Sequence, residues 1–428
     1  MAGTARANDQ QAQLQALYAE MRPHNLYPLW EVLHALVTPT PRSPALAHLW
    51  PYAPARDYLL RAGDLISAEQ AERRVLILEN PGLPGSSAVT PSLYAGLQLI
   101  LPGEVAPCHR HTQCALRFVM EGDGAYTAVD GEKAVMRPFD LVLTPNWQWH
   151  DHGNESGRPM IWLDGLDIPT VRFYDASFAE RLPTPSQSEA TPPGDSLRRY
   201  GRNLRPFRAT AADRRPAHQP LFHYPYAEWR ESLLALAAVE APDPHLGHAM
   251  EFVNPADGGP VMPTIAAHVR HLPAGFETKP RRSTDGTVFV VVEGRGTARV
   301  EGREFPLAER DLLVIPSWHA LELQAERPLI LFGYSDKAAQ EKLLLYREER
   351  QAAGAAPQRR PAVTAPRPVL ASGPGRRRSR VPPPPKPRAV PARPGACPAV
   401  QPSPGCCRTR PVSPRCRRLG RDRSRPGR

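Results

Sequence analysis

Hydrophobic residues follow two different periods along this chain, and the change of period separates its parts. In residues 9–22 they recur at the spacing of an amphipathic helix. A second helical stretch is expected near residues 30–36 and a third over 56–70, with Pro-rich, irregular chain between them. We therefore expect residues 1–74 to form a helical N-terminal arm that acts as a cap or as an oligomer contact.

From residue 75 to residue 175 the pattern changes to short apolar runs separated by turn residues. The predicted strands are 75–78, 93–101, 115–121, 124–129, 141–144 and 160–166. Gly-Asp-Gly at 122–124 and Asp-Gly at 130–131 punctuate these runs as hairpin turns. Many short strands with regular turns favour a β-sandwich or a β-barrel.

The pattern returns in the second half of the chain. Residues 119–124 (VMEGDG) match residues 291–296 (VVEGRG) at an offset of 172, and residues 140–147 (DLVLTPNW) match residues 311–318 (DLLVIPSW) at an offset of 171. The nearly constant offset of Gly, Pro, Trp and Asp indicates an internal duplication.

The duplication divides the body of the chain into three parts. We expect a first barrel over residues 75–175 and a second over residues 246–350, which ends in a closing helix at 336–350. The Pro-rich residues 176–245 are expected to be a linker with a helical piece around 226–239.

The net charge of +11 belongs to the C-terminal tail. Residues 351–428 hold 19 Lys and Arg, one acidic residue and 18 Pro, whereas the remainder has 35 basic and 42 acidic residues. Without apolar periodicity we expect this tail to be disordered. Its basic and Pro-rich runs suggest nucleic-acid or proline-motif recognition, but it has no aromatic residue on which a base could stack. We favour a frameshifted or read-through extension over a functional appendage.

Cysteine usage and apolar content indicate the compartment. Four of the six cysteines lie in the tail, and only Cys108 and Cys114 lie in the body, where we interpret both as packing residues. That is no disulfide framework, and it fits a reducing cytoplasm. The N-terminus has no apolar signal-peptide segment, and no apolar run reaches the roughly 18 residues that indicate a membrane span.

The chemistry of the chain is expected at three histidines. His109 and His111 are two residues apart, so on an extended strand both side chains point to the same face. His150 follows the turn at 145–147, on the strand that should return beside them. Three imidazoles on one side of a metal ion leave its other side open for substrate and oxygen, which is typical of non-haem iron. The alternative is a set of surface or core histidines.

The second barrel acts as an internal control for this interpretation. At the same offsets the three histidines are replaced by Arg281, Ser283 and Leu321. Histidine is therefore not needed to build the barrel, and we expect the second barrel to be degenerate and metal-free. His268 and His271, which flank a strand of the second repeat, are interpreted as structural.

Residues 103–118 (GEVAPCHRHTQCALRF) and 147–154 (WQWHDHGN) resemble the two cupin motifs of the gentisate 1,2-dioxygenase family. The resemblance covers roughly residues 10–350. It implies a mainly β, bicupin fold, a homo-oligomer that we expect to be a tetramer, and Fe(II) held by His109, His111 and His150. The common cupin motif also has a glutamate ligand shortly after the paired histidines, and its absence here fits the three-histidine branch.

Five further residues are candidates for the active site. Arg117 lies six residues after His111 and so shares its face, where it could clamp a substrate carboxylate or form a structural salt bridge. His152 shares the face of His150 and could act as an acid or base, donate a hydrogen bond, or only support a ligand. Gln98 and Arg73 match pocket positions of the family, and Asp164 could pair with a pocket base or arginine.

The resemblance implies O2-dependent, extradiol-type cleavage of gentisate to maleylpyruvate. Three neutral imidazoles leave the iron its full charge, which favours an anionic substrate that chelates through a carboxylate and the neighbouring hydroxyl. The bond between the carbons that bear these two groups would break. The alternatives are a related bicupin acting on salicylate or 1-hydroxy-2-naphthoate and, in another class, a non-enzymatic bicupin binding protein.

Overall fold

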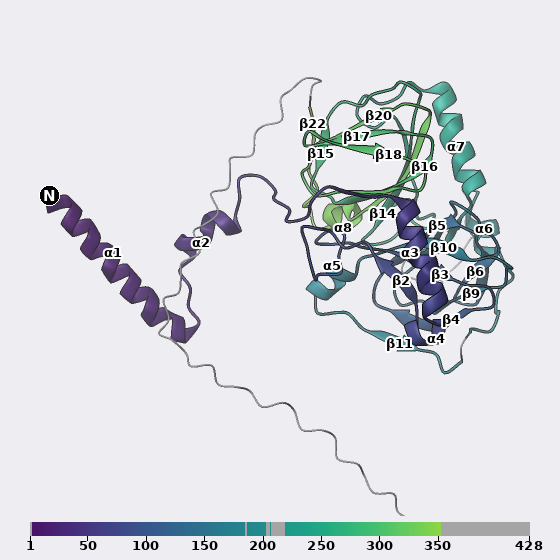
Figure 1. Cartoon of the computed structure of the whole chain (residues 1–428), viewed down its shortest axis with the longest axis horizontal. Coiled ribbons are helices and arrows are strands. Elements are labelled where there is room, and N and C mark those ends of the chain that lie inside the picture. The colour runs from purple at the N-terminus through teal and green to yellow at the C-terminus, as the bar shows by residue number, and fades with distance from the viewer. Residues whose placement is uncertain (1, 185, 203–205, 207–218, 352–428) are drawn as a thin grey trace, which may run out of the picture. The chain divides into compact units, whose positions relative to one another are not determined.

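The computed structural model describes residues 2–184, 186–202, 206 and 219–351. The expectations for the tail at 352–428 lie outside these residues. Within them the chain is mainly β, and Figure 1 shows the strands gathered into two barrels, which confirms the predicted bicupin fold. No helix of the described part is long and apolar enough to cross a membrane.

The first barrel is built from two sheets. Its strands are β2 (Arg74–Ile77), β3 (Tyr94–Ile100), β4 (Val105–His111), β5 (Ala115–Glu121), β6 (Ala125–Val129), β7 (Glu132–Val135), β8 (Leu141–Thr144), β9 (His150–Asn154), β10 (Met160–Leu166), β11 (Ala179–Arg181) and β12 (His223–Tyr224). They form a six-stranded sheet, β12-β8-β5-β10-β3-β2, and a five-stranded sheet, β11-β4-β9-β6-β7.

The second barrel repeats this arrangement. Its strands are β1 (His48–Trp50), β13 (His248–Glu251), β14 (Ala266–Leu272), β15 (Arg281–Ser283), β16 (Thr287–Glu293), β17 (Gly296–Val300), β18 (Arg303–Leu307), β19 (Leu312–Ile315), β20 (Leu321–Ala325), β21 (Leu329–Ser335) and β22 (Glu348–Arg350). The six-stranded sheet has the order β1-β19-β16-β21-β14-β13, and the five-stranded sheet the order β18-β17-β20-β15-β22.

Helices flank these sheets. They are α1 (Ala2–Met21), the 3-10 turn η1 (Arg22–His24), α2 (Leu29–Leu36), α3 (Tyr52–Leu65), α4 (Ala68–Ala71), α5 (Ile168–Phe173), α6 (Asp195–Tyr200), α7 (Tyr226–Val239) and α8 (Lys337–Lys342). The helices expected near 9–22, 30–36 and 226–239 are confirmed. The helix expected over 56–70 begins earlier, at Tyr52, because proline is tolerated in the first turn of a helix and Pro54 does not prevent it. It also ends earlier, at Leu65, and the separate short helix α4 follows the N-cap Ser67.

The closing helix predicted for residues 336–350 is wrong in its second half. α8 ends at Lys342, Leu344 adopts a left-handed φ of 60°, and residues 348–350 form β22 beside β15. The consecutive apolar residues at 343–345 would lie on different faces of a continued helix and could not all be buried. A ladder to β15 and an ion pair of 2.7 Å between Glu348 and Arg281 form instead.

Strand register confirms the internal duplication. His109 is the partner of His150 in the first barrel, and Arg281 is the partner of Leu321 in the second. The turn residues repeat as well. Gly122 and Gly294 both have φ near +90°, and a Cβ on either would lie within 2.7 Å of a backbone oxygen, Pro159 O or Pro328 O, so both turns require glycine.

The repeat also extends into the segments expected to be arm and linker. α3 and α7 have 14 residues each and follow β1 and β12, respectively. β1 pairs with β19 of the second barrel, and β12 pairs with β8 of the first. Each repeat therefore contributes one edge strand to the other repeat's barrel.

Equivalent hydrogen bonds hold the two helices in place. The backbone N–H groups of Tyr52 and Tyr226 donate to Asp311 and Asp140 in the barrels whose sheets their strands extend. Each helix also contacts the opposite barrel. Arg56 of α3 donates to Glu121 of the first barrel, and Arg230 of α7 donates to Glu293 of the second. Each helix thus links both barrels.

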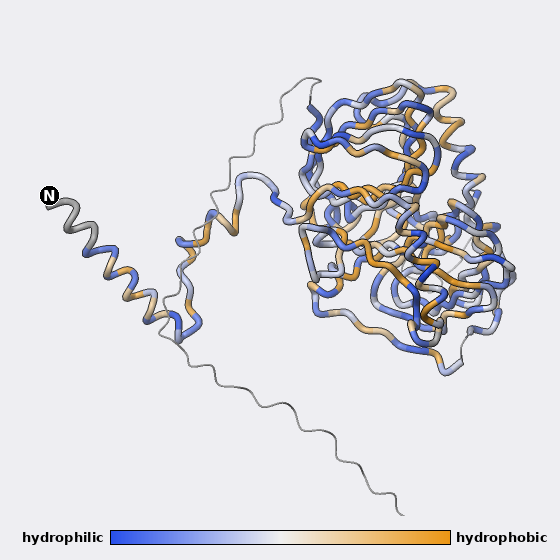
Figure 2. The backbone as a smooth tube through the Cα atoms, viewed as in Figure 1, coloured by the Kyte–Doolittle hydropathy of each residue, from blue (hydrophilic) through white to orange (hydrophobic). Residues whose placement is uncertain are grey.

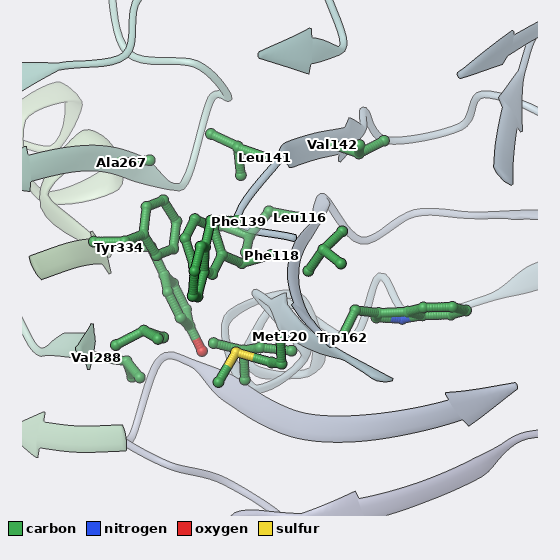
Figure 3. Close-up of a cluster of buried hydrophobic side chains, with 14 of the residues drawn as sticks. Leu116, Phe118, Met120, Phe139, Leu141, Val142, Trp162, Ala267, Val288 and Tyr334 are labelled. Atoms are coloured by element: carbon green, nitrogen blue, oxygen red, sulfur yellow. The ribbon is translucent and has the colours of Figure 1, made fainter. Parts of the chain in front are cut away.

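The main hydrophobic core lies between the two six-stranded sheets. Successive residues of β5 alternate in direction, so Leu116, Phe118 and Met120 face the second barrel. The ring of Phe118 stacks on that of Phe332, with centroids 4.0 Å apart. Figure 3 shows side chains from both barrels meeting in this core, with Trp162 pointing away from them. Figure 2 shows segments of hydrophobic residues running through the same region.

Candidate active site

The three predicted histidines meet inside the first barrel. His109 and His111 lie on β4, and His150 lies opposite His109 on β9. All three are buried, and one nitrogen of each lies within 4.8 Å of the other two. No other such group of potential metal ligands occurs among the described residues.

Backbone carbonyls fix the orientation of each ring. The Nδ1 atoms of the three histidines lie 2.9 Å from carbonyl oxygens two residues away along the chain, those of Pro107, Gln113 and Gln148. A carbonyl only accepts hydrogen bonds, so each Nδ1 carries the proton and each Nε2 keeps a lone pair. Among the described residues, the Nε2 atoms of His111 and His150 have no hydrogen-bond partner.

Electrostatics keep these rings neutral. Burial, reinforced by the charge of Arg73, lowers the pKa of His109 to about 3 and that of His111 to about 4. Burial likewise holds the pKa of His150 well below its ordinary value. Metal ligation requires the neutral imidazole, so three unprotonated donors around one point fit a divalent transition metal.

The two body cysteines do not join this group. Burial raises the pKa of Cys108 to about 11 and that of Cys114 to about 12, so both thiols are protonated at neutral pH. Cys108 precedes His109 on β4 and interacts with Asp151 on β9. Both cysteines are buried, as expected of packing residues.

Arg117 projects into the same interior from β5. Its side chain is 2% exposed, its Nε lies 3.4 Å from an oxygen of Asp164, and a terminal nitrogen donates to the hydroxyl of Thr144. Burial lowers the pKa of Arg117 to about 10, which still leaves the guanidinium charged at neutral pH. The predicted pairing of Asp164 with a pocket arginine is therefore present, on directly opposite residues of β5 and β10.

Asp164 is anchored on its other side by an indole. The Nε1–H of Trp162 donates to Asp164 at 3.0 Å. Burial raises the pKa of Asp164, and the charge of Arg117 opposes this effect. Trp162 was not among the residues expected at the site, although its spacing of two from Asp164 is a signal that could have identified it.

Arg73 and Gln98 complete the polar lining. Arg73 directly precedes β2, and its guanidinium contacts the ring nitrogens of His109. Gln98 lies on β3 opposite Trp162 and is 3% exposed. Both residues therefore share the barrel interior with the histidines.

His152 lies two residues after His150 on β9. Its Nδ1 is 2.9 Å from the hydroxyl of Thr127, the residue opposite it on β6, and its Nε2 has no partner among the described residues. Burial holds the pKa of His152 well below its ordinary value, so the ring is neutral. Thr127 and Thr144 were also missed from sequence, because threonine is common in strands and gives no specific signal.

Comparison with known proteins agrees with this geometry. A model of the cupin domain matches residues 96–166, which span all three histidines. A gentisate 1,2-dioxygenase 1 from Aquipseudomonas alcaligenes is 50% identical over 333 residues, covering 78% of this chain and 95% of that protein. The chain belongs to the gentisate 1,2-dioxygenase family.

Two further relatives place the chain within this family. A gentisate 1,2-dioxygenase from a Streptomyces species is 37% identical, covering 82% of this chain and 99% of that protein. The solved salicylate 1,2-dioxygenase of Pseudoaminobacter salicylatoxidans, an adduct with gentisate, superposes with a TM-score of 0.75 at 35% identity over 79% of this chain and 94% of that chain. The chain is accordingly a ring-cleaving dioxygenase with a three-histidine metal site of the gentisate 1,2-dioxygenase family.

Proposed function

We propose that this enzyme uses O2 to open the ring of gentisate, giving maleylpyruvate, with Fe(II) held by His109, His111 and His150. The observation that carries the proposal is the convergence of three neutral imidazoles beside the buried cation Arg117. When bound, iron would accept the carboxylate and adjacent hydroxyl oxygens of the substrate and activate O2.

The residues around the histidines favour an aromatic carboxylate. Arg117 and Arg73 place two guanidinium groups in the barrel interior, where Asp164 is the acidic partner of Arg117. We propose that Arg117 binds the substrate carboxylate, because a guanidinium matches a carboxylate with two parallel hydrogen bonds. Asp164, held by Trp162, would keep the guanidinium in position, and Arg73 and Gln98 would contact the ring substituents.

His152 is proposed to handle the proton of a substrate hydroxyl. The ring is neutral and fully buried, and Thr127 can accept a hydrogen bond from Nδ1. In that tautomer Nε2 keeps a lone pair and can accept the proton that the hydroxyl loses on binding. Thr127 would then act as a positioning residue for His152.

Salicylate and 1-hydroxy-2-naphthoate are the alternative substrates. The first is favoured by the similarity to the salicylate 1,2-dioxygenase, which was itself solved with gentisate. Gentisate ranks above it because the 50% identical relative is named a gentisate dioxygenase. None of the similar proteins named above supports a non-enzymatic binding role.

An oxygen-uptake assay tests the proposal. Protein loaded anaerobically with Fe(II) is expected to consume one O2 per gentisate, and to turn over salicylate and 1-hydroxy-2-naphthoate more slowly. His111→Gln should lose iron and activity together, whereas His34→Gln, an exposed histidine of α2, should retain both. Iron-loaded protein that takes up no oxygen with gentisate would overturn the assignment.

We further propose a cytoplasmic homotetramer, as the family resemblance implies. Support for the compartment comes from Cys108 and Cys114, which are free and buried. Support for self-association comes from the N-terminal arm, where Leu29, Trp30 and Leu36 are all more than half exposed. Light scattering of the purified enzyme checks the assembly.

A further inference from the structure

The interior of the second barrel holds a polar cluster at the position of the first barrel's site. Arg270 and His268 on β14 correspond to Gln98 and Gly96 on β3, at an offset of 172, and Arg281 corresponds to His109. The cluster therefore lies on β14 and β15, the strands equivalent to β3 and β4 of the first barrel, but its side chains differ in chemistry.

Arg270 is a buried cation with no hydrogen-bonded counter-ion among the described residues. It is 6% exposed, and among the described residues its guanidinium makes no hydrogen bond and no ion pair within 4 Å. Its guanidinium lies over the ring of Phe289, whose centroid is 5.0 Å from Cζ. Leaving a buried charge without a hydrogen-bonded counter-ion costs on the order of several kcal/mol, so a guanidinium in this setting favours the binding of an anion.

The acidic groups near Arg270 make no hydrogen bond or ion pair with it. Glu348 pairs with Arg281 at 2.7 Å and with Arg350 at 2.6 Å. Asp285 interacts with Arg270 only through space. Its Oδ2 accepts a hydrogen bond from Thr287, and its Oδ1 is buried with no hydrogen-bond partner among the described residues. Neither carboxylate therefore neutralises Arg270 by direct contact.

Two nitrogen atoms near Arg270 are also unsatisfied. The Nε2 of His268 and the Nε of Arg281 are buried and have no hydrogen-bond partner among the described residues. Burial, together with the charges of Arg270 and Arg281, keeps the pKa of His268 well below its ordinary value. The neutral ring can donate or accept one hydrogen bond beside the two guanidinium groups.

The surrounding walls limit what can bind. Phe289 stands where the first barrel has Arg117, and Leu321 stands where it has His150, so one side of the cluster is apolar. Asp285 and Glu348 would repel a doubly charged phosphate. A singly charged ligand with a flat apolar body fits this combination better.

We propose that the second barrel is a binding site for a small carboxylate anion, held by the guanidinium of Arg270 with Arg281 and His268 beside it. The site is distinct from the three-histidine centre and needs no metal. His268 would then serve a ligand rather than only the packing of its strand. Small aromatic carboxylates suit both the guanidinium fork and the Phe289 wall.

Calorimetric titration of the iron-loaded full chain with 4-bromobenzoate tests the proposal by stoichiometry. Arg270→Gln, which introduces the residue that the first barrel has at this position, should bind one equivalent fewer than the wild type. Arg327→Gln, an exposed arginine before β21, should match the wild type. Equal stoichiometry in the wild type and Arg270→Gln, or no binding by the wild type, would overturn the proposal.

Thermal unfolding separates a ligand site from a structural arginine. Because Arg270→Gln removes an unpaired buried charge, its melting temperature without ligand should equal or exceed that of the wild type. 4-Bromobenzoate should stabilise the wild type more than Arg270→Gln. Arg270→Lys keeps the charge but loses the planar guanidinium, so it should bind 4-bromobenzoate at least about tenfold more weakly than the wild type. Binding by Arg270→Lys as tight as that of the wild type would contradict the assigned geometry. Anomalous scattering from bromine should place the ligand beside Arg270.

Discussion

At the scale of single residues, the site depends on which atom of each side chain is free. The three Nδ1 atoms are held by carbonyls of their own strand or its flanking turns, so the three Nε2 atoms face one another. Neighbouring side chains likewise fix Arg117, which donates a hydrogen bond to Thr144 and pairs with Asp164. Their proposed roles follow from these contacts and can be tested one at a time.

Arg117→Gln should lower kcat/KM for gentisate by roughly 100-fold, or about 2–3 kcal/mol, because it removes a charge-assisted hydrogen bond to the substrate. The bound iron should remain at the wild-type level. Steady-state oxygen uptake and metal analysis measure the two quantities. Arg137→Gln, at an arginine whose side chain is 74% exposed, is the control, and iron lost in proportion to activity would point to a structural role for Arg117.

At the scale of elements, strand register decides which side chains of neighbouring strands lie opposite each other. β4 and β9 place His109 opposite His150, and the equivalent pair of β15 and β20 places Arg281 opposite Leu321. β22 shows the limit of local patterns, because its residues have helical neighbours in sequence yet form a strand. The partner that decides this is β15, about 65 residues earlier in the chain.

Glu348→Gln should weaken the attachment of β22 in a pH-dependent manner. Burial alone would raise the pKa of Glu348, but hydrogen bonds from Arg281 and Arg350 outweigh it and lower the pKa to about 2. The carboxylate therefore stabilises the fold above pH 4.5, its ordinary pKa, and this contribution disappears as the pH falls toward 2. At pH 7 we expect a loss of roughly 1–2 kcal/mol in the free energy of unfolding, reduced by partial exposure.

Denaturant unfolding at pH 7 and at pH 3 measures this difference, with Glu326→Gln, an exposed glutamate of the same barrel, as the control. The gap between Glu348→Gln and wild type should be smaller at pH 3. A gap that stays constant or widens on acidification would rule out the ion pair as its cause.

At the scale of the whole molecule, the two repeats are joined through exchanged strands and a shared core. α3 and α7 each bind both barrels, and Phe118 stacks on Phe332 across the interface. The described fold closes with β22 and a backbone hydrogen bond from Gln351 to Pro280.

Removing residues 352–428 should leave the melting temperature and the oxygen uptake unchanged, because we interpret this Pro- and Arg-rich segment as an extension without a role. Differential scanning calorimetry and the gentisate assay on the shortened and full chains test this expectation. A drop in activity at equal stability would assign a function to the basic tail and contradict its interpretation as an extension without a role.

Much of the site could be predicted from sequence alone because the relevant signals are local. Alternation with period two placed His109 and His111 on one face, and constant offsets identified the duplication and its degenerate second copy. The continuous strand expected to carry Arg117 on the same face is wrong, because β4 ends at His111 and Arg117 reaches the interior from β5 in the other sheet. The resemblance to the gentisate 1,2-dioxygenase family rested on the same short segments. None of these inferences required knowing which strands pair.

Only the tertiary structure decided the features that depend on distant partners. It showed that Thr127 and Thr144 support His152 and Arg117, that β1 and β12 exchange between barrels, and that the Nε of Arg270 is buried with no hydrogen-bond partner among the described residues. Hydrogen bonds and charge compensation are properties of atoms brought together from far along the chain, whereas periodicity is a property of neighbours. The sequence therefore determined the metal-binding face of the strand, and folding determined the groups that support it.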